Sequence, residues 1–465
     1  MISMELEAQQ STSCEKIGFS PWWMFTFFIT ILKKFHAKVA RLFTKLKKIA
    51  EEDPRRVYHS FKVGLALTLV SIFYYVTPLF NGFGSSCMWA VLTVVVVMEF
   101  TVGATLGKGL NRTLATVLAG SLALGAHHLA ELCGEKMEPI LLGILVFILA
   151  SAATFSRFIP RVKKRYDYGV TIFILTFSLV AVSSYRVDEV IPLAHQRAST
   201  IAVGVATCLC TTFFVFPVWA GEDLHKLTAT NLEKLACFLQ GLGDDYFQDK
   251  AKKENKVGEK KDYFQSYKSV LNSKPTEESL ANFAKWEPGH NGFGFRHPWN
   301  QYLKIGASTR RCAYSTEALS AFLTACDSKP KPDPNDEVGT KIRSACAEMS
   351  SESAKALSDL ASSIRTMSAP TLARQHMAAA SAAAEKLKTV LLYSGSVAEI
   401  VHVATIGAIL VEIVNCEHEI VGTVEELSRL AGFRRAEAVN EAPVKPGNEE
   451  QCPSVVITMS GIRIV

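Results

Sequence analysis

Charged residues are scarce in this chain of 465 residues. Asp, Glu, Lys and Arg make up 20% of it, whereas a soluble chain carries about 25%. With 49% hydrophobic residues, the composition excludes a disordered or fibrous protein. The shortage of charge is concentrated in residues 63–220, which hold long uncharged runs, while residues 221–465 read as an ordinary soluble helical domain. We therefore predict an integral membrane protein with a large soluble tail.

The sequence also lacks the patterns of metal sites, secretion and catalysis. Its eleven cysteines show no paired metal spacing and are scattered through apolar stretches and tail alike, which suits a reducing cytosol. The first apolar stretch, Phe19–Leu32, follows acidic and polar residues and has no cleavage pattern of a signal peptide. There is no nucleophile elbow and no pair of carboxylates in a plausible pocket. We predict no enzyme activity, no metal and no cofactor.

The N-terminal region is basic in a chain whose net charge is only +6. Most of its positive residues lie between Lys33 and Arg56. Next to a membrane span, such a segment binds anionic headgroups more often than nucleic acid. Phe19–Leu32 is too short to cross ~30 Å of hydrocarbon. With its aromatic residues and following lysines it is predicted to lie in the cytoplasmic interface, the alternative being a re-entrant or seventh span.

Six apolar stretches have close to the ~20 residues that a membrane helix needs. They are Val63–Phe80, Met88–Leu106, Leu114–Leu132, Ile140–Phe155, Tyr168–Ser184 and Ala198–Trp219. The loop Arg157–Arg165 is strongly basic, whereas the loop Asn81–Cys87 has no charge. By the positive-inside rule, both termini are then cytosolic.

The tail is patterned for helices. The helical stretches are Leu224–Tyr246, Tyr263–Trp286, Tyr302–Cys326, Glu337–Thr366 and Leu372–Arg429, the last broken near Ser394. Pro288–Pro298 predicts an ordered loop packed by its own side chains. The fold class is thus all-α. We expect residues 1–57 as a cytosolic N-terminal segment with the interfacial stretch, 58–220 as a six-span pore domain, 221–435 as a cytosolic helical domain and 436–465 as a flexible tail.

Lys108 and Arg112 are the first candidate site residues. Their i, i+4 spacing places them on one helix face, about 6 Å apart along the axis. Like charges in this relation repel, so an anion between or opposite them would relieve a cost. The alternative is that both end the second span and extend to the cytoplasmic headgroups.

Arg197 stands near the start of the sixth span, on the side that the charge bias makes extracellular. Both the positive-inside tendency and the helix dipole disfavour a cation there. A basic residue placed against both tendencies is a candidate for a functional site. The alternative is a simple pairing with Asp188 or Glu189.

Glu99 is the one carboxylate in the middle of a predicted span. As a proton-coupling group it would support an active transporter. The alternative is structural, since an acid within the membrane usually has a partner.

Several strings resemble the plant aluminium-activated malate transporter family. The strings that resemble its first span, second span, sixth-span exit and cytosolic signature are Glu51–Leu67, Met88–Arg112, Trp219–His225, and Trp286-Glu-Pro followed by Phe295–Trp299. The resemblance covers roughly residues 50–325. It implies a homodimeric plant anion channel with six spans per subunit and a helical cytosolic half. Such a channel conducts malate and inorganic anions passively through a pore lined with basic residues.

The resemblance also implies roles for single residues. The family's pore arginines correspond to Arg112 and Arg197, and Lys108 is our own addition on the same face. Because conduction needs weak binding at several sites, two separated rings would serve better than one deep trap. Glu287 stands where the family has an acidic residue linked to transport competence. The stretch proposed in this family to respond to 4-aminobutyrate corresponds to Phe213, Phe214 and Phe216, although an interfacial aromatic belt predicts the same residues.

Aluminium activation does not follow from the resemblance. Al(III) needs several oxygen ligands, and the predicted outer loops offer few carboxylates. The alternative function is a proton-coupled organic-acid exporter with Glu99 as its coupling residue, and a membrane scaffold would leave Arg197 unexplained. Among partners we expect malate, inorganic anions, membrane lipid and a second copy of the chain, but no nucleic acid. The plasma membrane is favoured, with the vacuolar membrane as the alternative.

Overall fold

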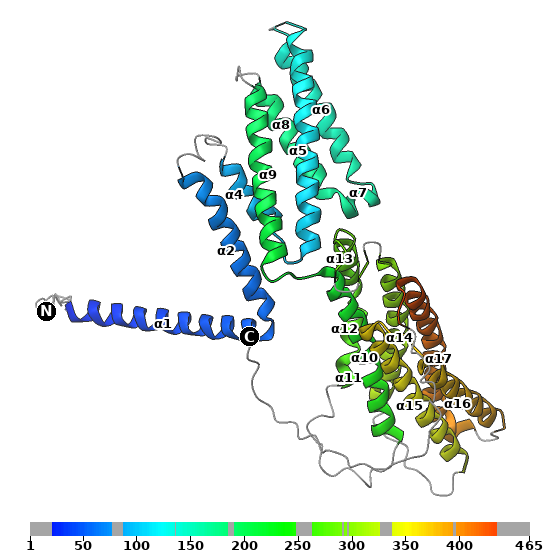
Figure 1. Cartoon of the computed structure of the whole chain (residues 1–465). Helices are drawn as coiled ribbons and strands as arrows, with labels where there is room; N and C mark the ends of the chain where they lie inside the picture. The colour runs from blue at the N-terminus through cyan, green and yellow to red at the C-terminus, as the bar shows by residue number, and fades with distance from the viewer. Residues whose placement is uncertain are drawn as a thin grey trace, which may run out of the picture. The chain divides into compact units, whose positions relative to one another are not determined.

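The chain folds almost entirely into helices (Figure 1). The computed structural model describes residues 21–76, 87–134, 136–184, 190–247, 263–290, 293–294, 297–325, 337–393 and 397–434. In these residues there are two isolated β-bridges and no strand, so the all-α prediction is confirmed. The predicted C-terminal tail, 436–465, lies outside the described residues. Two compact units form, Met1–Leu227 with Ser273–Gly306, and Thr228–Asn272 with Ala307–Val465.

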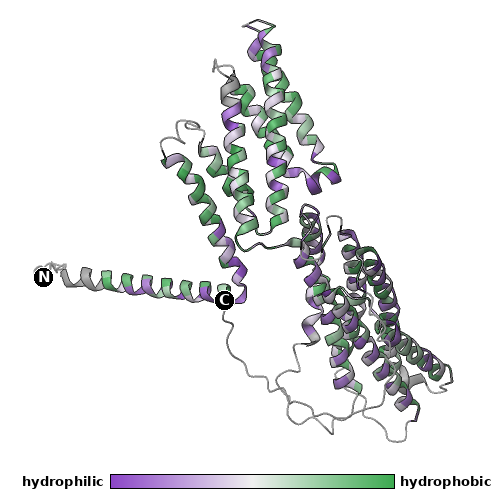
Figure 2. Ribbon diagram, viewed as in Figure 1, coloured by the Kyte–Doolittle hydropathy of each residue, from purple (hydrophilic) through white to green (hydrophobic). Residues whose placement is uncertain are grey.

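The first unit holds the most apolar helices of the chain (Figure 2). Up to residue 214 its helices are α1 (Pro21–Glu52), α2 (Pro54–Tyr75), α4 (Cys87–Val97), α5 (Val102–Glu131), α6 (Glu138–Ser156), α7 (Pro160–Arg165), α8 (Asp167–Ser184) and α9 (Val190–Phe214). Within the described residues, four helices are long and apolar enough to cross a membrane: α2, α5, α6 and α9. The helices α4 and α8 are apolar but shorter. The prediction of membrane helices is therefore confirmed, and the count of six spans stays a prediction.

The chain turns between α4 and α5 earlier than the sequence indicated. The predicted span Met88–Leu106 is wrong at its end, because α4 ends at Val97 and α5 begins at Val102. The Thr101 hydroxyl accepts a hydrogen bond from the backbone N–H of Ala104 and so caps α5. The N–H of Val102 donates to the carbonyl of Val218, 2.9 Å away. Lys108 and Arg112 consequently lie inside α5 and do not end the second span.

Two apolar clusters hold the membrane helices together. One joins α2, α4 and α9 through residues such as Ala66, Val94 and Val205. The other joins α5, α6 and α8, where small side chains on α5 let its neighbours approach closely. The small residues are Ala119, Ala123, Ala126 and Ala130. Large side chains such as Phe147, which is 72% exposed, remain on the outside of α6, as expected for a surface that contacts lipid.

The remaining helices continue the chain after the apolar region. They are α10 (Ala220–Leu242), the π-helix η2 (Gly243–Phe247), α11 (Tyr263–Ser266), α12 (Lys268–Leu271), α13 (Lys274–Ala284), α14 (Trp299–Ala325), α15 (Glu337–Thr366), α16 (Ala373–Tyr393) and α17 (Val397–Ala431). In the second unit, α15 packs against α16 and α17. The boundary between the units falls within α10 and within α14.

The predicted helices of the tail are confirmed with one exception. Glu337–Thr366 forms α15 with the predicted bounds, and the predicted interruption separates α16 from α17. Tyr263–Trp286 is wrong as a single helix, because it forms the short α11, α12 and α13. The break before α13 coincides with Pro275 near its start, where the missing N–H is tolerated.

The loop between α13 and α14 is packed by its own rings, as predicted for Pro288–Pro298. Its His290 and Phe293 form an isolated bridge, and Phe293 is buried. The Phe293 ring lies 5.3 Å from that of Trp299 and 4.9 Å from that of His297. For the described residues of this loop the prediction is confirmed.

Candidate functional site

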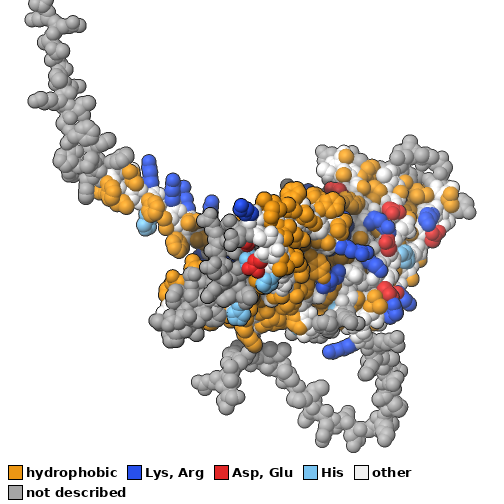
Figure 3. Space-filling view, turned by 90° about the horizontal axis from the view of Figure 1, so that it is seen from above, with side chains coloured by type: hydrophobic (Ala, Val, Ile, Leu, Met, Phe, Trp, Pro, Cys, Tyr) orange, Lys and Arg blue, Asp and Glu red, His pale blue; other side chains and the backbone are white. Residues whose placement is uncertain are grey.

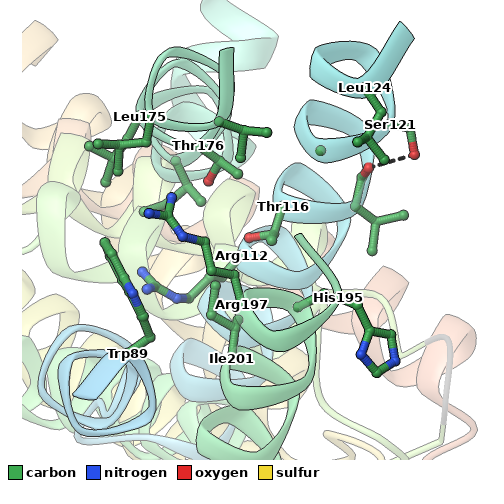
Figure 4. Close-up of a pocket in the computed structure, with 16 residues that line it drawn as sticks. Trp89, Arg112, Thr116, Ser121, Leu124, Leu175, Thr176, His195, Arg197 and Ile201 are labelled. Atoms are coloured by element: carbon green, nitrogen blue, oxygen red, sulfur yellow. Dashed lines mark hydrogen bonds between the residues drawn. The ribbon is translucent and has the colours of Figure 1, made fainter. Parts of the chain in front are cut away.

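A cavity of about 260 Å³ lies among four helices of the first unit (Figure 4). The helices α4, α5, α8 and α9 each contribute part of its wall, with Trp89, Arg112, Thr176 and Arg197 as examples. Most of the wall is apolar. None of the described residues that line the cavity carries a carboxylate, so two guanidinium groups give the cavity a net positive charge.

Arg112 reaches the cavity from α5. The residue is only 3% exposed, and its Nη1 donates to the Tyr168 hydroxyl at 3.3 Å. Its Nε is buried and has no hydrogen-bond partner among the described residues. A buried cation without an opposite charge is costly, so an anion in the cavity would stabilise this arrangement.

Arg197 reaches the same cavity from α9. Its guanidinium carbon lies 5.0 Å from the centre of the Trp89 ring, which is the geometry of a cation–π contact. The Nε of Arg197 is also buried with no hydrogen-bond partner among the described residues. The alternative partners named from the sequence, Asp188 and Glu189, lie outside the described residues.

The two arginines therefore line one chamber of this chain. Figure 4 shows both side chains extending between Trp89 and Thr176. Thr116 also lines the cavity, and its buried hydroxyl oxygen has no hydrogen-bond partner among the described residues. Sequence reasoning missed Trp89 and Tyr168, because only the packing of separate helices brings them to the arginines. It also missed Thr116, although the i, i+4 spacing from Arg112 on α5 was an available signal.

Lys108 does not join the two arginines. Its Nζ forms an ion pair with the carboxylate of Glu99 across the turn between α4 and α5. The same ammonium lies 5.6 Å from the centre of the Tyr168 ring. Tyr168 therefore contacts Lys108 with its ring and Arg112 with its hydroxyl. The charge of Lys108 is balanced locally, and this residue does not line the cavity.

The aromatic residues at the end of α9 lie outside the cavity wall. Phe214 is 84% exposed, while Phe213 packs edge-on against Trp219. Phe216 has a positive φ of 46°, which is uncommon for a residue other than glycine. Its ring stacks on Tyr58 at 4.5 Å.

Lys62 holds the backbone of Phe216 in place. Its ammonium donates to the Phe216 carbonyl at 3.3 Å, and the lysine has no exposed surface. Sequence reasoning missed this contact between α2 and the end of α9. A lysine directly before the predicted span Val63–Phe80 was the available signal.

Glu287 is buried at the start of two helices. Its carboxylate accepts hydrogen bonds from the backbone N–H groups of Ala220 at 2.6 Å, Gly221 at 3.0 Å and Gly103 at 3.3 Å. Ala220 and Gly221 open α10, and Gly103 is the second residue of α5. A carboxylate is stabilised at a helix N-terminus by the free N–H groups and the helix dipole. Burial raises the pKa of Glu287, and the N–H groups oppose that shift.

The neighbouring Trp286 packs against the same part of α5. A Cβ added at Gly107 would meet the Trp286 indole, and one added at Gly103 would collide with the carbonyl of Phe283. These two glycines therefore allow the end of α13 and the residues after it to approach α5 closely. Trp286 also contacts Arg165, whose guanidinium carbon lies 4.6 Å from the centre of the Trp286 ring. Trp286 and Glu287 together fix the start of the helix that carries Arg112.

Comparison with known proteins shows which family this chain resembles. The family model described as aluminium activated malate transporter matches residues 47–398. Aluminum-activated malate transporter 1 of Triticum aestivum is 55% identical over 89% of this chain and 91% of its own length. Aluminum-activated malate transporter 2 of Arabidopsis thaliana is 48% identical over 85% of this chain and 79% of its own length.

These relatives are named as transporters and not as enzymes, so the prediction of a protein without enzyme activity is confirmed. Family membership and the apolar helices together make the chain a multi-pass membrane protein. The resemblance inferred from the sequence is confirmed: the chain belongs to the aluminium-activated malate transporter family.

Proposed function

We propose that the protein is a passive anion channel that conducts malate and inorganic anions across a plant membrane. The observation that carries this proposal is the cavity with two arginines and no carboxylate among its described lining residues. The names of the relatives supply malate as the substrate. Chloride and nitrate are included because a positive chamber with apolar walls selects first for charge and only then for shape.

The chemistry of the cavity suits a small dicarboxylate. Malate carries two charges at neutral pH, and removing them from water is costly unless fixed cations replace the hydration shell. A guanidinium meets a carboxylate with two parallel hydrogen bonds and stays charged in surroundings of low polarity. Arg112 and Arg197 would then each bind one end of the anion, and the Thr116 hydroxyl would supply a further donor.

The membrane topology belongs to the same proposal. We infer that α2, α4, α5, α6, α8 and α9 all cross the membrane within residues 58–220, with both termini in the cytosol. The basic helix α7, which contains Arg161, Lys163 and Lys164, supports a cytosolic position for the loop between α6 and α8. Residues 221–435 would form the cytosolic helical domain, and residues 1–57 and 436–465 the flanking cytosolic segments.

We also propose a homodimer in the plasma membrane, with the vacuolar membrane as the alternative location. Two copies of the basic side chains of α5 and α9 around one axis would give a positive funnel that attracts anions from solution. Cross-linking in the native membrane tests the dimer. A monomer that conducts after reconstitution would contradict it.

The second candidate is a proton-coupled exporter that uses Glu99. The ion pair between Glu99 and Lys108 favours a structural role for this carboxylate, since its charge is already balanced. Recordings from oocytes distinguish the two functions. With malate, nitrate and chloride exchanged in turn, the current of a channel reverses at the Nernst potential of the conducted anion. A reversal potential that follows the proton gradient at constant anion concentrations would instead establish the exporter.

A further inference from the structure

Helix α1 has two faces of opposite character (Figure 2). At 3.6 residues per turn its large apolar side chains fall within about a third of the circumference. These apolar residues, which we call the apolar face, are Phe28, Ile31, Leu32, Phe35, Leu42, Phe43, Leu46 and Ile49. The rest of the helix surface carries the basic residues Lys33, Lys34, Lys38, Arg41, Lys45, Lys47 and Lys48.

The apolar face of α1 is open to solvent in the described structure. Phe35 is 65% exposed and Phe43 is 68% exposed, and the other residues of the apolar face are exposed as well. Figure 3 shows hydrophobic side chains along α1, with Lys and Arg gathered on one edge of the helix. Exposed apolar surface of this extent marks an interaction site.

The charge on α1 argues against a second copy of the same helix as the partner. Between residues 33 and 50 there are seven Lys and Arg and no Asp or Glu. Paired α1 helices would bring like charges together along the edges of the apolar face, whereas helix pairs are usually stabilised by opposite charges there. A membrane leaflet with anionic headgroups and apolar acyl chains is complementary to both the basic and the apolar face of α1.

The position of α1 in the chain points to the same partner. Only Asp53 separates its end at Glu52 from the start of α2 at Pro54, and α2 is one of the helices able to cross a membrane. With seven basic residues, α1 is itself too charged to cross. A helix of this composition beside a span lies in the headgroup region with its apolar face toward the acyl chains.

We propose that α1 lies along the cytosolic leaflet and binds anionic phospholipid headgroups through its basic face. The proposal extends the interfacial position predicted for Phe19–Leu32 to the whole of α1 through Glu52. It is independent of which anion the protein transports. The leaflet would thereby fix the direction in which the chain enters α2.

The full-length protein in lipid nanodiscs tests this proposal. A fluorescent unnatural amino acid at Phe35 probes the apolar face, and the same residue at Thr44 is the matched probe on the polar face. Nanodiscs contain phosphatidylcholine with or without phosphatidylserine. Nitroxide on the acyl chains quenches a probe in the membrane, and iodide quenches a probe in water.

With phosphatidylserine, we expect the nitroxide to quench the Phe35 probe roughly fivefold more than the Thr44 probe. The ratio of nitroxide quenching between the Phe35 and Thr44 probes should fall by roughly half or more when phosphatidylserine is left out. It should fall by a similar amount in the triple variant Lys38→Glu, Arg41→Glu and Lys45→Glu. The control triple variant is Lys341→Glu, Lys355→Glu and Lys388→Glu, since these are exposed lysines of the second unit. It should retain this quenching ratio.

Two results would overturn the proposal. Equal quenching of both probes by iodide would mean that α1 stays in water. Protection of the Phe35 probe from both quenchers would mean that protein covers the apolar face, either the second unit or another copy. Energy transfer between labelled protomers would then identify the second copy.

Discussion

The carboxylate of Glu287 lies 2.6 Å from the backbone nitrogen of Ala220, the first residue of α10. The same side chain accepts a hydrogen bond from Gly103 at the start of α5. Since α10 follows the exit of α9, and α5 carries Arg112, one buried acid joins the starts of two helices that extend from the candidate pore. This relationship gives a physical reason to expect that a change at Glu287 affects transport.

Replacing Glu287 should therefore disturb both structure and transport. Glu287→Ala leaves three buried N–H groups without their acceptor, which costs on the order of 3 kcal/mol. We expect a lower unfolding temperature of the purified protein and a malate current reduced by at least about tenfold. Glu287→Gln keeps one acceptor oxygen but loses the charge at two helix N-termini, so its effects should be intermediate.

Glu222→Gln is the matched control, because Glu222 is an acid of the first turn of α10 that pairs with Lys226 on the surface. It should leave both measurements close to those of the unaltered protein. A Glu287→Ala protein with normal unfolding temperature and normal current would show that the hydrogen bonds to Gly103 and Ala220 do not matter.

The ion pair between Glu99 and Lys108 predicts a coupled pair of effects. Lys108→Ala leaves the negative charge of Glu99 unbalanced at the start of the helix that carries Arg112, so the malate current should fall. Glu99→Gln leaves the positive charge of Lys108 unbalanced, so anion affinity should rise. The effect of the double variant on malate affinity should differ from the sum of the two single effects, with a coupling energy of about 1 kcal/mol or more in a double-mutant cycle.

Concentration–current curves for malate measure this cycle. Effects that simply add would contradict the ion pair as a functional unit. A current that loses its dependence on the proton gradient in Glu99→Gln would instead support the proton-coupled exporter.

Glu417 predicts how stability changes with pH. This residue of α17 is fully buried, and neither carboxylate oxygen has a hydrogen-bond partner among the described residues. Burial raises the pKa of Glu417 from 4.5 to about 8. Between these values the folded protein holds a proton that the unfolded chain releases. The contribution of Glu417 to the free energy of unfolding is complete below pH 4.5. It decreases as the pH rises from 4.5 to about 8, by up to about 1.4 kcal/mol per pH unit.

Thermal unfolding from about pH 6 to about pH 8 tests this expectation. Glu417→Gln cannot ionise, so its unfolding temperature should fall less over this range than that of the unaltered protein. Glu385→Gln is the control, since Glu385 pairs with Lys388 on the surface. Equal pH dependence in all three proteins would show that Glu417 does not titrate in this range.

Local patterns were enough to predict the long helices of the tail. The bounds of α15 and the break between α16 and α17 follow from helical periodicity over neighbouring residues. Arg112 and Arg197 could be selected for a similar reason, because each is a cation in a region where membrane helices disfavour charge.

Contacts between distant parts of the chain could not be predicted in this way. The apolar run through Val97 gives no sign of the turn before α5, which depends on a hydrogen bond from Val102 to Val218. The partners of Glu287 lie 184 and 67 positions away in the sequence. That Arg112 and Arg197 share one cavity depends on the packing of α5 beside α9.

The shared cavity leads to a prediction about the two arginines. Arg112→Ala and Arg197→Ala, or the glutamate variants, should each abolish or sharply reduce the malate current while surface protein stays intact. Arg112→Lys should retain some current, since the charge survives without the planar fork. Trp89→Leu keeps both arginines but removes the cation–π contact, worth about 1 kcal/mol, so its effect should be smaller.

If one malate binds both arginines, their contributions to affinity are not independent. The double variant Arg112→Lys with Arg197→Lys should then lower malate affinity by less than the product of the single effects, because each single change already disrupts the same bound anion. Arg161→Ala in the exposed helix α7 is the control and should leave malate affinity unchanged. Two separated anion sites would give independent effects whose product equals that of the double variant. If the alanine variants reach the membrane and carry normal malate current, Arg112 and Arg197 serve only packing or headgroup contacts, and the proposed anion site is wrong.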